Sequence, residues 1–286
     1  MLAAPKNRLA LRCAVIAAGI LAIPGCSRNG RAGTETSTAG AADAAVLVAR
    51  PEAATSPWNP DIVRSGSESY PLRRFSYALK DVTLGIEDIG MRASLREILE
   101  QRHALLAVNG GFFDTHGMPL GLAVSNGRVL ASFVPSLSGG VLGVDRGRGW
   151  LEETESFLTP SPAVDFAIQC RPRLVVAGNA NIRSDDGKRA ARTAICLRDA
   201  GAVVDFIIVR GDLGRADPRE SEGRPGPSLF ALAHHLAQLG CQEALNLDGG
   251  PSTGAAFWED GKMRHLAPRA PIRHAILVRP RRDAGR

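Results

Sequence analysis

Between about Tyr70 and Pro280 the chain is divided into many short apolar segments of strand length, separated by turn residues. Residues 75–79 alternate apolar and polar side chains, as a strand with one buried face does. Asn126-Gly127, between two such segments, predicts a hairpin with a type I′ turn. Further strand-like segments are predicted at 104–108, 121–125, 128–133, 141–144, 150–152, 166–169, 173–176, 193–197, 203–209 and 275–278.

Only two segments have clear helical signals. Ser94 is a candidate N-cap with Glu97 three residues later, and residues 228–239 have leucines at helical spacing. Ser228 and Gly240 are candidate caps for that second helix. Many short strands with few helices predict an α+β fold, a single domain with a mainly antiparallel sheet.

The predicted domain spans residues 70–282, about 200 residues, which suits one hydrophobic core. Residues 283–286 are predicted to be a tail. Residues 26–69 are rich in small and polar residues and have few large apolar ones, which is typical of a flexible tether.

The N-terminus has the pattern of a targeting segment. Lys6, Arg8 and Arg12 precede the apolar run 13–23, which is shorter than the roughly 20 residues that a spanning helix needs. The run leads into Cys26 in a pattern that resembles a bacterial lipobox, and a plain secretory signal is the alternative. We therefore predict a signal peptide over residues 1–25, a lipid on Cys26, and an exported, membrane-anchored protein on the periplasmic or cell-surface side.

Charge argues against nucleic acid as a partner. Loss of residues 1–25 lowers the formal charge from +6 to +3, because three basic and no acidic side chains leave with them. No basic patch with interleaved aromatic residues is present in the sequence. The arginines near the C-terminus are expected to be a solvated tail.

Five cysteines are present, and two of them belong to the targeting segment. Export permits a disulfide among Cys170, Cys196 and Cys241, with one thiol left over. Cys170 and Cys196 both lie in strand-like runs and are the preferred pair. Neither cysteines nor histidines have the spacing of a zinc site.

Two predicted strand ends have the same residue pattern. Residues 104–108 lead into Asn109-Gly110-Gly111, and Leu245 to Leu247 lead into Asp248-Gly249-Gly250. Each places a polar side chain and a glycine pair directly after an apolar strand. Glycine pairs allow a sharp turn or a close approach of the backbone to a ligand. An ordinary turn is the alternative for both.

Together these two motifs resemble the phosphodiester glycosidase family, over about Ala104 to Val278 of the chain. Further pieces agree in order: Pro119–Leu122, Asn126-Gly127, Pro172–Val175, Arg192–Ile195, Leu239-Gly240 and Arg273–Ile276. Two positions depart from the family pattern. Pro251 stands where a third glycine is usual, which removes a backbone N–H. Cys196 stands where the family often has glycine.

The resemblance implies cleavage of a sugar–phosphate diester, which commonly needs two carboxylates. Asp248 is the first candidate, as nucleophile or as acid/base. Asp114 and Asp212 are candidates for the second, and each has the alternative of a turn residue.

Arg192 and Arg273 are the best candidates for binding the phosphate, because a guanidinium matches two phosphate oxygens. We predict that Asn109, Arg192, Asp248 and Arg273 converge on one cleft. The predicted substrate-binding residues are Asn109, Gly110, Gly111, Arg192, Thr193, Gly249, Gly250, Ser252, Thr253 and Arg273.

The expected function is therefore an exported hydrolase of a sugar phosphodiester, in surface glycan or exopolysaccharide metabolism. The alternative is a non-catalytic glycan-binding or scaffold lipoprotein that keeps the fold. The expected partners are the sugar phosphodiester or surface glycan and the membrane, and the protein is expected to be a monomer. A divalent cation near Asp248 is compatible with the sequence, but no spacing demands a metal or another cofactor.

Overall fold

The computed structural model describes residues 61–92, 94–157, 164–211, 213 and 226–281. The predicted signal peptide, Cys26, most of the predicted tether, Asp212 and the tail lie outside these residues.

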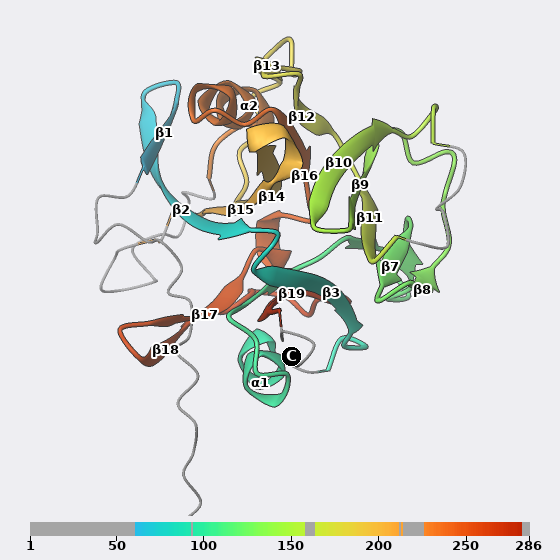
Figure 1. The fold of residues 1–286 in the computed structure, drawn as a ribbon. Helices are drawn as coiled ribbons and strands as arrows, with labels where there is room; N and C mark the ends of the chain where they lie inside the picture. The colour runs from blue at the N-terminus through green and yellow to red at the C-terminus, as the bar shows by residue number, and fades with distance from the viewer. Residues whose placement is uncertain (1–60, 93, 158–163, 212, 214–225, 282–286) are drawn as a thin grey trace, which may run out of the picture. The chain divides into compact units, whose positions relative to one another are not determined.

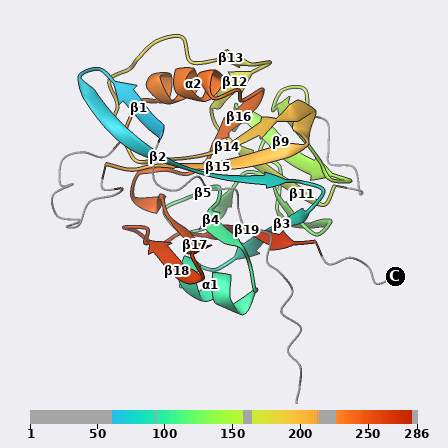
Figure 2. The same cartoon turned by 60° about the vertical axis from the view of Figure 1, so that its left-hand side comes forward.

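The described strands form three large sheets and one small hairpin, and every described pairing is antiparallel (Figures 1 and 2). The largest sheet has the order β1 (Asp61–Ser65), β2 (Glu68–Ala78), β15 (Val203–Val209), β14 (Arg192–Arg198), β16 (Glu243–Asn246), β12 (Arg173–Val176) and β13 (Asn179–Ala180). The second has the order β10 (Arg148–Glu153), β9 (Gly140–Asp145), β11 (Phe166–Cys170), β7 (Ala123–Ser125) and β8 (Arg128–Ala131). The third has the order β18 (Lys262–Leu266), β17 (Ala255–Glu259), β4 (Leu106–Asn109), β19 (His274–Pro280) and β3 (Val82–Asp88). The hairpin pairs β5 (Phe112–Phe113) with β6 (Pro119–Leu120). The predicted fold class, mainly antiparallel with few helices, is confirmed.

One buried core joins the inner faces of the three large sheets. It includes Phe206 of β15, Phe166 of β11 and Phe257 of β17, all nearly inaccessible to solvent. Because side chains alternate along a strand, the outer faces need separate covers. Burial between the sheets is the main apolar contribution to the stability of the fold.

The two α-helices provide two of these covers (Figures 1 and 2). Helix α2 (Leu229–Gln238) packs Leu232 and Leu236 against the outer face of the largest sheet. Helix α1 (Leu95–Gln101) packs Leu95 and Leu99 against the outer face of the third sheet. No helix within the described residues is long and apolar enough to cross a membrane.

Several local predictions are confirmed. Ser94 and Glu97 form a capping box at the start of α1, and the Ser228 side chain caps α2. Asn126 and Gly127 have φ values of 50° and 72° between β7 and β8, as a type I′ turn requires.

The start of the folded unit was predicted too late. Residues 61–69, placed in the tether by composition, form β1 and the first residues of β2 in the largest sheet. Val63 is fully buried in the core beneath α2. Its segment is polar apart from a few side chains, so composition alone did not separate it from the tether.

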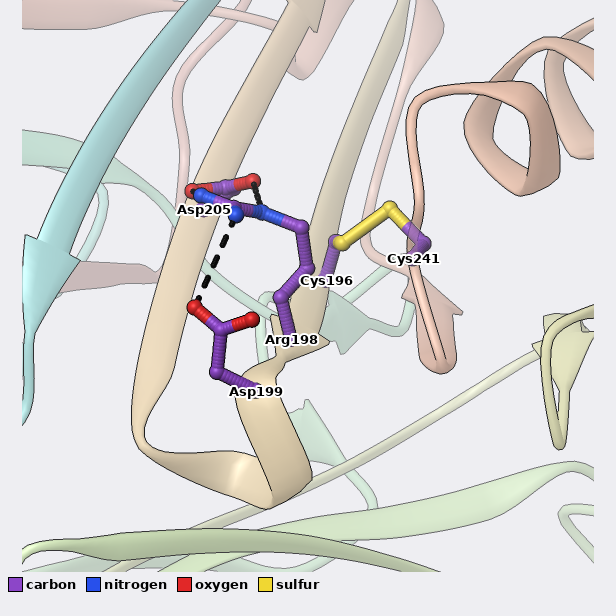
Figure 3. Close-up of a disulfide and its surroundings, with 5 residues drawn as sticks. All are labelled: Cys196, Arg198, Asp199, Asp205 and Cys241. Carbon is purple, nitrogen blue, oxygen red and sulfur yellow. Dashed lines mark hydrogen bonds and ion pairs between the residues drawn. A yellow bond between two sulfur atoms is a disulfide. The ribbon is translucent and has the colours of Figure 1, made fainter.

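The preferred disulfide was wrong. Cys196 is bonded to Cys241, with 5.7 Å between their Cα atoms (Figure 3). Cys170 is a free, buried thiol. Cys196 alternates with the inward-facing Ile195, so its side chain lies on the α2 side of β14, where Cys241 follows the helix. Cys170 lies in the core between the sheets instead. Beside the disulfide, Arg198 forms a two-point ion pair with the buried Asp205, at 2.7 and 3.1 Å.

Candidate functional site

The Asn109 side chain connects three segments at the end of β4. Its Nδ2 donates to the carbonyl oxygen of Asp248 at 2.7 Å. Its Oδ1 accepts from Thr193 Oγ1 at 2.7 Å and from the Gly254 N–H at 3.2 Å. Asn109 is only 1% exposed, so these bonds replace contacts with water. The side chain therefore holds the two glycine-rich strand ends and the start of β14 together.

The backbone at Gly110 makes the same connection. The Asp248 N–H donates to the Gly110 carbonyl at 3.2 Å, and the Gly110 N–H donates to the His274 carbonyl at 2.9 Å. A Cβ on Gly110 would lie 2.8 Å from the His274 Cβ, which is closer than side chains approach. Glycine is therefore required here by the close approach of β19.

Asp248 lies two residues beyond the end of β16 and is half-buried. Its Oδ1 accepts from the Gly249 N–H at 2.9 Å. Burial raises the pKa of this carboxyl above its ordinary value, while hydrogen bonds from Ser252 and Gly249 lower it to a lesser extent. A raised pKa moves a carboxyl toward the range in which general acids and bases work.

The turn after Asp248 accommodates Pro251. Gly250 has φ +58°, a left-handed conformation that favours glycine, and its N–H donates to the Ala191 carbonyl at 2.7 Å. Gly250 to Ser252 form a short 3₁₀ helix with the proline in its first turn. Proline is well tolerated there, because N–H groups in a first turn have no partner within the helix.

A cleft of about 1120 Å³ lies beside this turn. Asn246, two residues before Asp248, and Arg192, next to the carbonyl that binds Gly250, both line it. Asp248 itself does not line the cleft, and Asn246 is the lining residue nearest to it along the chain. The basic residues that line the cleft are Arg171, Arg173, Lys188, Arg189 and Arg192.

Arg192 differs from most of these cations because no carboxylate pairs with it among the described residues. Its Nε donates to the Pro227 carbonyl at 3.1 Å and one Nη to the Lys188 carbonyl at 3.2 Å. Burial lowers its pKa, which reports partial removal of the guanidinium from water. Arg173, Lys188 and Arg189 instead form ion pairs, with Glu153, Asp186 and Asp185 respectively. Arg192 is therefore positioned to bind an anion.

Arg273 was predicted to lie in the same cleft as Arg192, but the structure places its guanidinium elsewhere. One Nη forms an ion pair with Asp88 at 2.5 Å, and the other donates to the Gly117 carbonyl at 2.9 Å. It does not line the cleft that Arg192 lines. The backbone of the next residue, His274, is hydrogen-bonded to Gly110. The backbone beside Arg273 therefore lies at the strand ends, whereas the Arg273 guanidinium does not.

Asp114 lies in the turn between β5 and β6. Its Oδ1 accepts from the N–H groups of His116 and Met118, both at 2.8 Å. The Met118 bond is the largest cause of a lowered pKa. This geometry matches the turn role that the sequence left open. Asp212, the other candidate second carboxylate, lies outside the described residues.

Some buried polar atoms of the described residues have no hydrogen-bond partner, and two of them belong to residues that flank Asp248 along the chain, Asn246 and Thr253. Within the described part of the chain, five buried side-chain atoms have no hydrogen-bond partner, and four of them belong to Asn246, Thr253, Arg273 and His274. Such atoms are rare in native proteins and are often associated with functional sites. Ser252, also predicted, bonds to the Asp248 side chain.

Sequence reasoning missed several residues of the cleft. Asn246 is 6% exposed, and its Nδ2 donates to the carbonyls of Arg171 and Leu247. Its position at the end of the predicted strand, two residues before Asp248, was a usable signal, because polar side chains at strand ends often line sites. The carboxylates of the cleft wall belong to Glu153, Glu155 and Asp186. No group of three or more potential metal-binding side chains occurs in the described ranges.

A family model for phosphodiester glycosidases matches residues 102–279. The chain belongs to the phosphodiester glycosidase family. The match covers both strand ends, Arg192 and the Asp248 turn. Membership supports a glycosidase-type hydrolase.

Two solved structures of low sequence identity share this fold. One is the zebrafish N-acetylglucosamine-1-phosphodiester alpha-N-acetylglucosaminidase catalytic domain, auto-inhibited by its pro-peptide, with 19% identity and a TM-score of 0.55. That match covers 78% of this chain and 87% of the zebrafish one. The other is a protein from Synechocystis, with 16% identity and a TM-score of 0.55, over 78% of this chain. This chain spans only 61% of the Synechocystis protein. No functionally curated protein matches the sequence.

Proposed function

We propose that this phosphodiester glycosidase family member hydrolyses a sugar phosphodiester at the bond between the anomeric carbon and the phosphate oxygen. The observation that carries the proposal is the half-buried Asp248 with its raised pKa, near a cleft lined by Arg192, which forms no ion pair with a carboxylate among the described residues. The zebrafish relative is named for action on N-acetylglucosamine 1-phosphodiesters. A diester of that sugar is therefore the first substrate to test.

In this reaction Arg192 holds the phosphate oxygens, since a guanidinium can donate to two of them. Water adds to the anomeric carbon, and the phosphate leaves as a monoester. Asp248 serves as acid/base or as nucleophile, and the cleft carboxylates Glu153, Glu155 and Asp186 are candidates for the second acidic group. The positive charge of Arg192 also stabilises the monoester that forms.

A panel of sugar 1-phosphodiesters, assayed for release of reducing sugar, tests the proposal directly. The methyl diester of N-acetylglucosamine 1-phosphate, with two or three other sugars, makes a sufficient first set. Turnover by the wild-type chain supports a hydrolase. Failure to turn over any diester, together with measurable binding of glycans, would favour the non-catalytic alternative.

Arg192→Lys tests the phosphate contact. Lysine keeps the charge but loses the two-point geometry, so KM should rise by about 10-fold with a smaller fall in kcat. Arg96→Lys is a matched control, because Arg96 is an exposed side chain on α1. Equal KM values for wild type and Arg192→Lys would remove Arg192 from substrate binding.

The alternative of a glycan-binding or scaffold protein rests on Pro251, which lacks the N–H that a glycine would offer at the start of the 3₁₀ helix. Pro251→Gly restores that donor. If the wild type binds glycans without hydrolysing them and Pro251→Gly gains turnover, this chain is a binding protein derived from the enzyme fold.

We also propose that the protein is exported and anchored through a lipid on Cys26, where its substrates would be surface glycans or exopolysaccharide. The support is the lipobox-like pattern after the apolar run 13–23. Cys26→Ser should move the protein from the membrane fraction to the soluble fraction. Recovery of the wild type itself in the soluble fraction would refute the anchor.

A further inference from the structure

The cleft is built from chemically different parts. Its apolar part comes from the β5–β6 hairpin, through Phe112, Phe113 and Leu120, and from Leu137 in the loop before β9. Its basic part comes from β12, from the segment 188–192 that leads into β14, and from Arg171. A ligand that fills this cleft therefore meets apolar side chains along one part and cations along another.

The β5–β6 hairpin also exposes apolar side chains to solvent. Only four large apolar side chains are exposed within the described residues, those of Ile62, Met118, Leu120 and Val129. Met118 and Leu120, at 55% and 40%, lie on or next to β6. Leu120 lines the cleft as well, so the apolar part of the cleft continues out to the surface at this hairpin. Apolar surface that continues from a cleft marks a binding site more often than isolated exposed residues do.

The hairpin is held next to the candidate reacting group. Phe112 follows Gly110 by two residues, and the Gly110 carbonyl accepts from the Asp248 N–H at 3.2 Å. Phe112 also packs against the core between the sheets, which anchors the hairpin. The apolar surface therefore begins close to Asp248, while Arg192 lies in the basic, anion-binding part of the same cleft.

The cleft is large for a single sugar phosphate with a small alcohol. Its volume of about 1120 Å³ is at the upper end of ordinary ligand pockets, which hold drug-sized molecules. The cleft therefore has room for a larger group on the other side of the phosphate.

We propose that the group esterified to the phosphate on the side away from the sugar is an apolar chain, and that it lies along Phe112, Leu120 and Met118, which share one face of the β5–β6 hairpin. The substrate would then be amphiphilic, a sugar linked through a phosphodiester to a lipid-like alcohol. This inference rests on the proposed function, because it assigns the alcohol portion of that same substrate.

The test compares two diesters of N-acetylglucosamine 1-phosphate, with methanol and with octanol as the alcohol, at concentrations below micelle formation. Each buried methylene favours binding by about 4-fold, so burial of only three predicts a kcat/KM about 60-fold higher for the octyl diester. A preference below about 3-fold in the wild type, less than one buried methylene would give, would overturn the inference and leave the proposed function intact.

Variants show whether the hairpin produces the preference. The double variant Met118→Ser/Leu120→Ser should lower the octyl-to-methyl ratio of kcat/KM by at least about 5-fold. Val129→Ser is the matched control, because Val129 is also an exposed apolar residue but belongs to β8 and not to the β5–β6 hairpin. A ratio that falls equally in both variants, or in neither, contradicts the assignment.

Calorimetric binding of the same two diesters separates the two proposals if neither is hydrolysed. Tighter binding of the octyl diester that is weakened by Met118→Ser/Leu120→Ser supports the apolar site although the hydrolase proposal has failed. Equal binding of both diesters, or binding of neither, overturns the apolar site.

Discussion

The strand end at Asn109 and the strand end at Asp248 have the same pattern of apolar strand, polar side chain and two glycines, but their polar side chains are held differently. Asn109 is 1% exposed, and both ends of its amide are bonded to other segments. Asp248 is half-buried, and among the described residues its carboxyl bonds only within its own turn, to Gly249 and Ser252. The first side chain is suited to holding the site together, and the second to reacting.

The comparison predicts its largest effect for Asn109→Ala. The change leaves Thr193 Oγ1, the Gly254 N–H and the Asp248 carbonyl without their partner, and each buried unpaired group costs about 1–3 kcal/mol. We expect the free energy of unfolding to fall by about 3 kcal/mol or more in urea titrations. Asn179→Ala, at an exposed position in β13, is the control. A loss below about 1 kcal/mol would mean that Asn109 does not hold the strand ends together.

Asp248→Asn should show the opposite pattern. It keeps the side chain's size and its acceptor for the Gly249 N–H but removes the acid/base capacity. We expect kcat on a sugar phosphodiester to fall by at least ~10²-fold, the scale on which acid–base groups act, with little loss of stability. Asp260→Asn, in an exposed turn at φ +50°, is the matched control. Full activity in Asp248→Asn would exclude Asp248 from the mechanism.

Thr193→Val tests the hydrogen bonds of Asn109 with a smaller change than Asn109→Ala. It removes the hydroxyl that donates to Asn109 while keeping the volume of a residue that is fully buried. We expect a loss of about 1 kcal/mol in the free energy of unfolding, because one buried hydrogen bond disappears. Thr83→Val, on the partly exposed side of β3, should change stability by less. Equal effects of the two changes would show that the Thr193 hydroxyl adds nothing to the Asn109 connection.

The pH dependence of stability should reveal the raised pKa of Asp248. A folded-state pKa above the usual 3.8 means that the folded state holds a proton that the unfolded state has already lost. The contribution of the Asp248 carboxyl to the free energy of unfolding therefore falls as pH rises from about 3.8 through the folded-state pKa. The amide side chain of the Asp248→Asn variant does not titrate, so the variant should gain stability relative to wild type over that window. Unfolding of both proteins from about pH 3 to about pH 7 measures the difference, and a relative gain by the wild type would contradict the burial of the carboxyl.

Local sequence signals predicted most of the elements. Capping by Ser94 and Ser228 and the Asn126-Gly127 turn act over a few residues, so the structure confirms them. The strand β1 was missed because its few apolar residues become buried only when α2 and β2 surround them. The pattern at Asp248 predicted a turn with a carboxylate. The hydrogen bond from the Asp248 N–H to the Gly110 carbonyl was not predictable from that pattern, because it joins the ends of two strands that are distant along the chain.

The sequence by itself determined the family, the antiparallel fold class and the two glycine-rich strand ends, because these depend on short patterns of apolar, glycine and capping residues. Tertiary structure decided which distant side chains meet. It paired Cys196 with Cys241, because strand alternation and α2 bring those two together. It also bound the Arg273 guanidinium to Asp88 and placed Asn246 in the cleft with Arg192. The physical reason is that charge pairing and burial act through space, between residues whose separation along the chain says little about their distance.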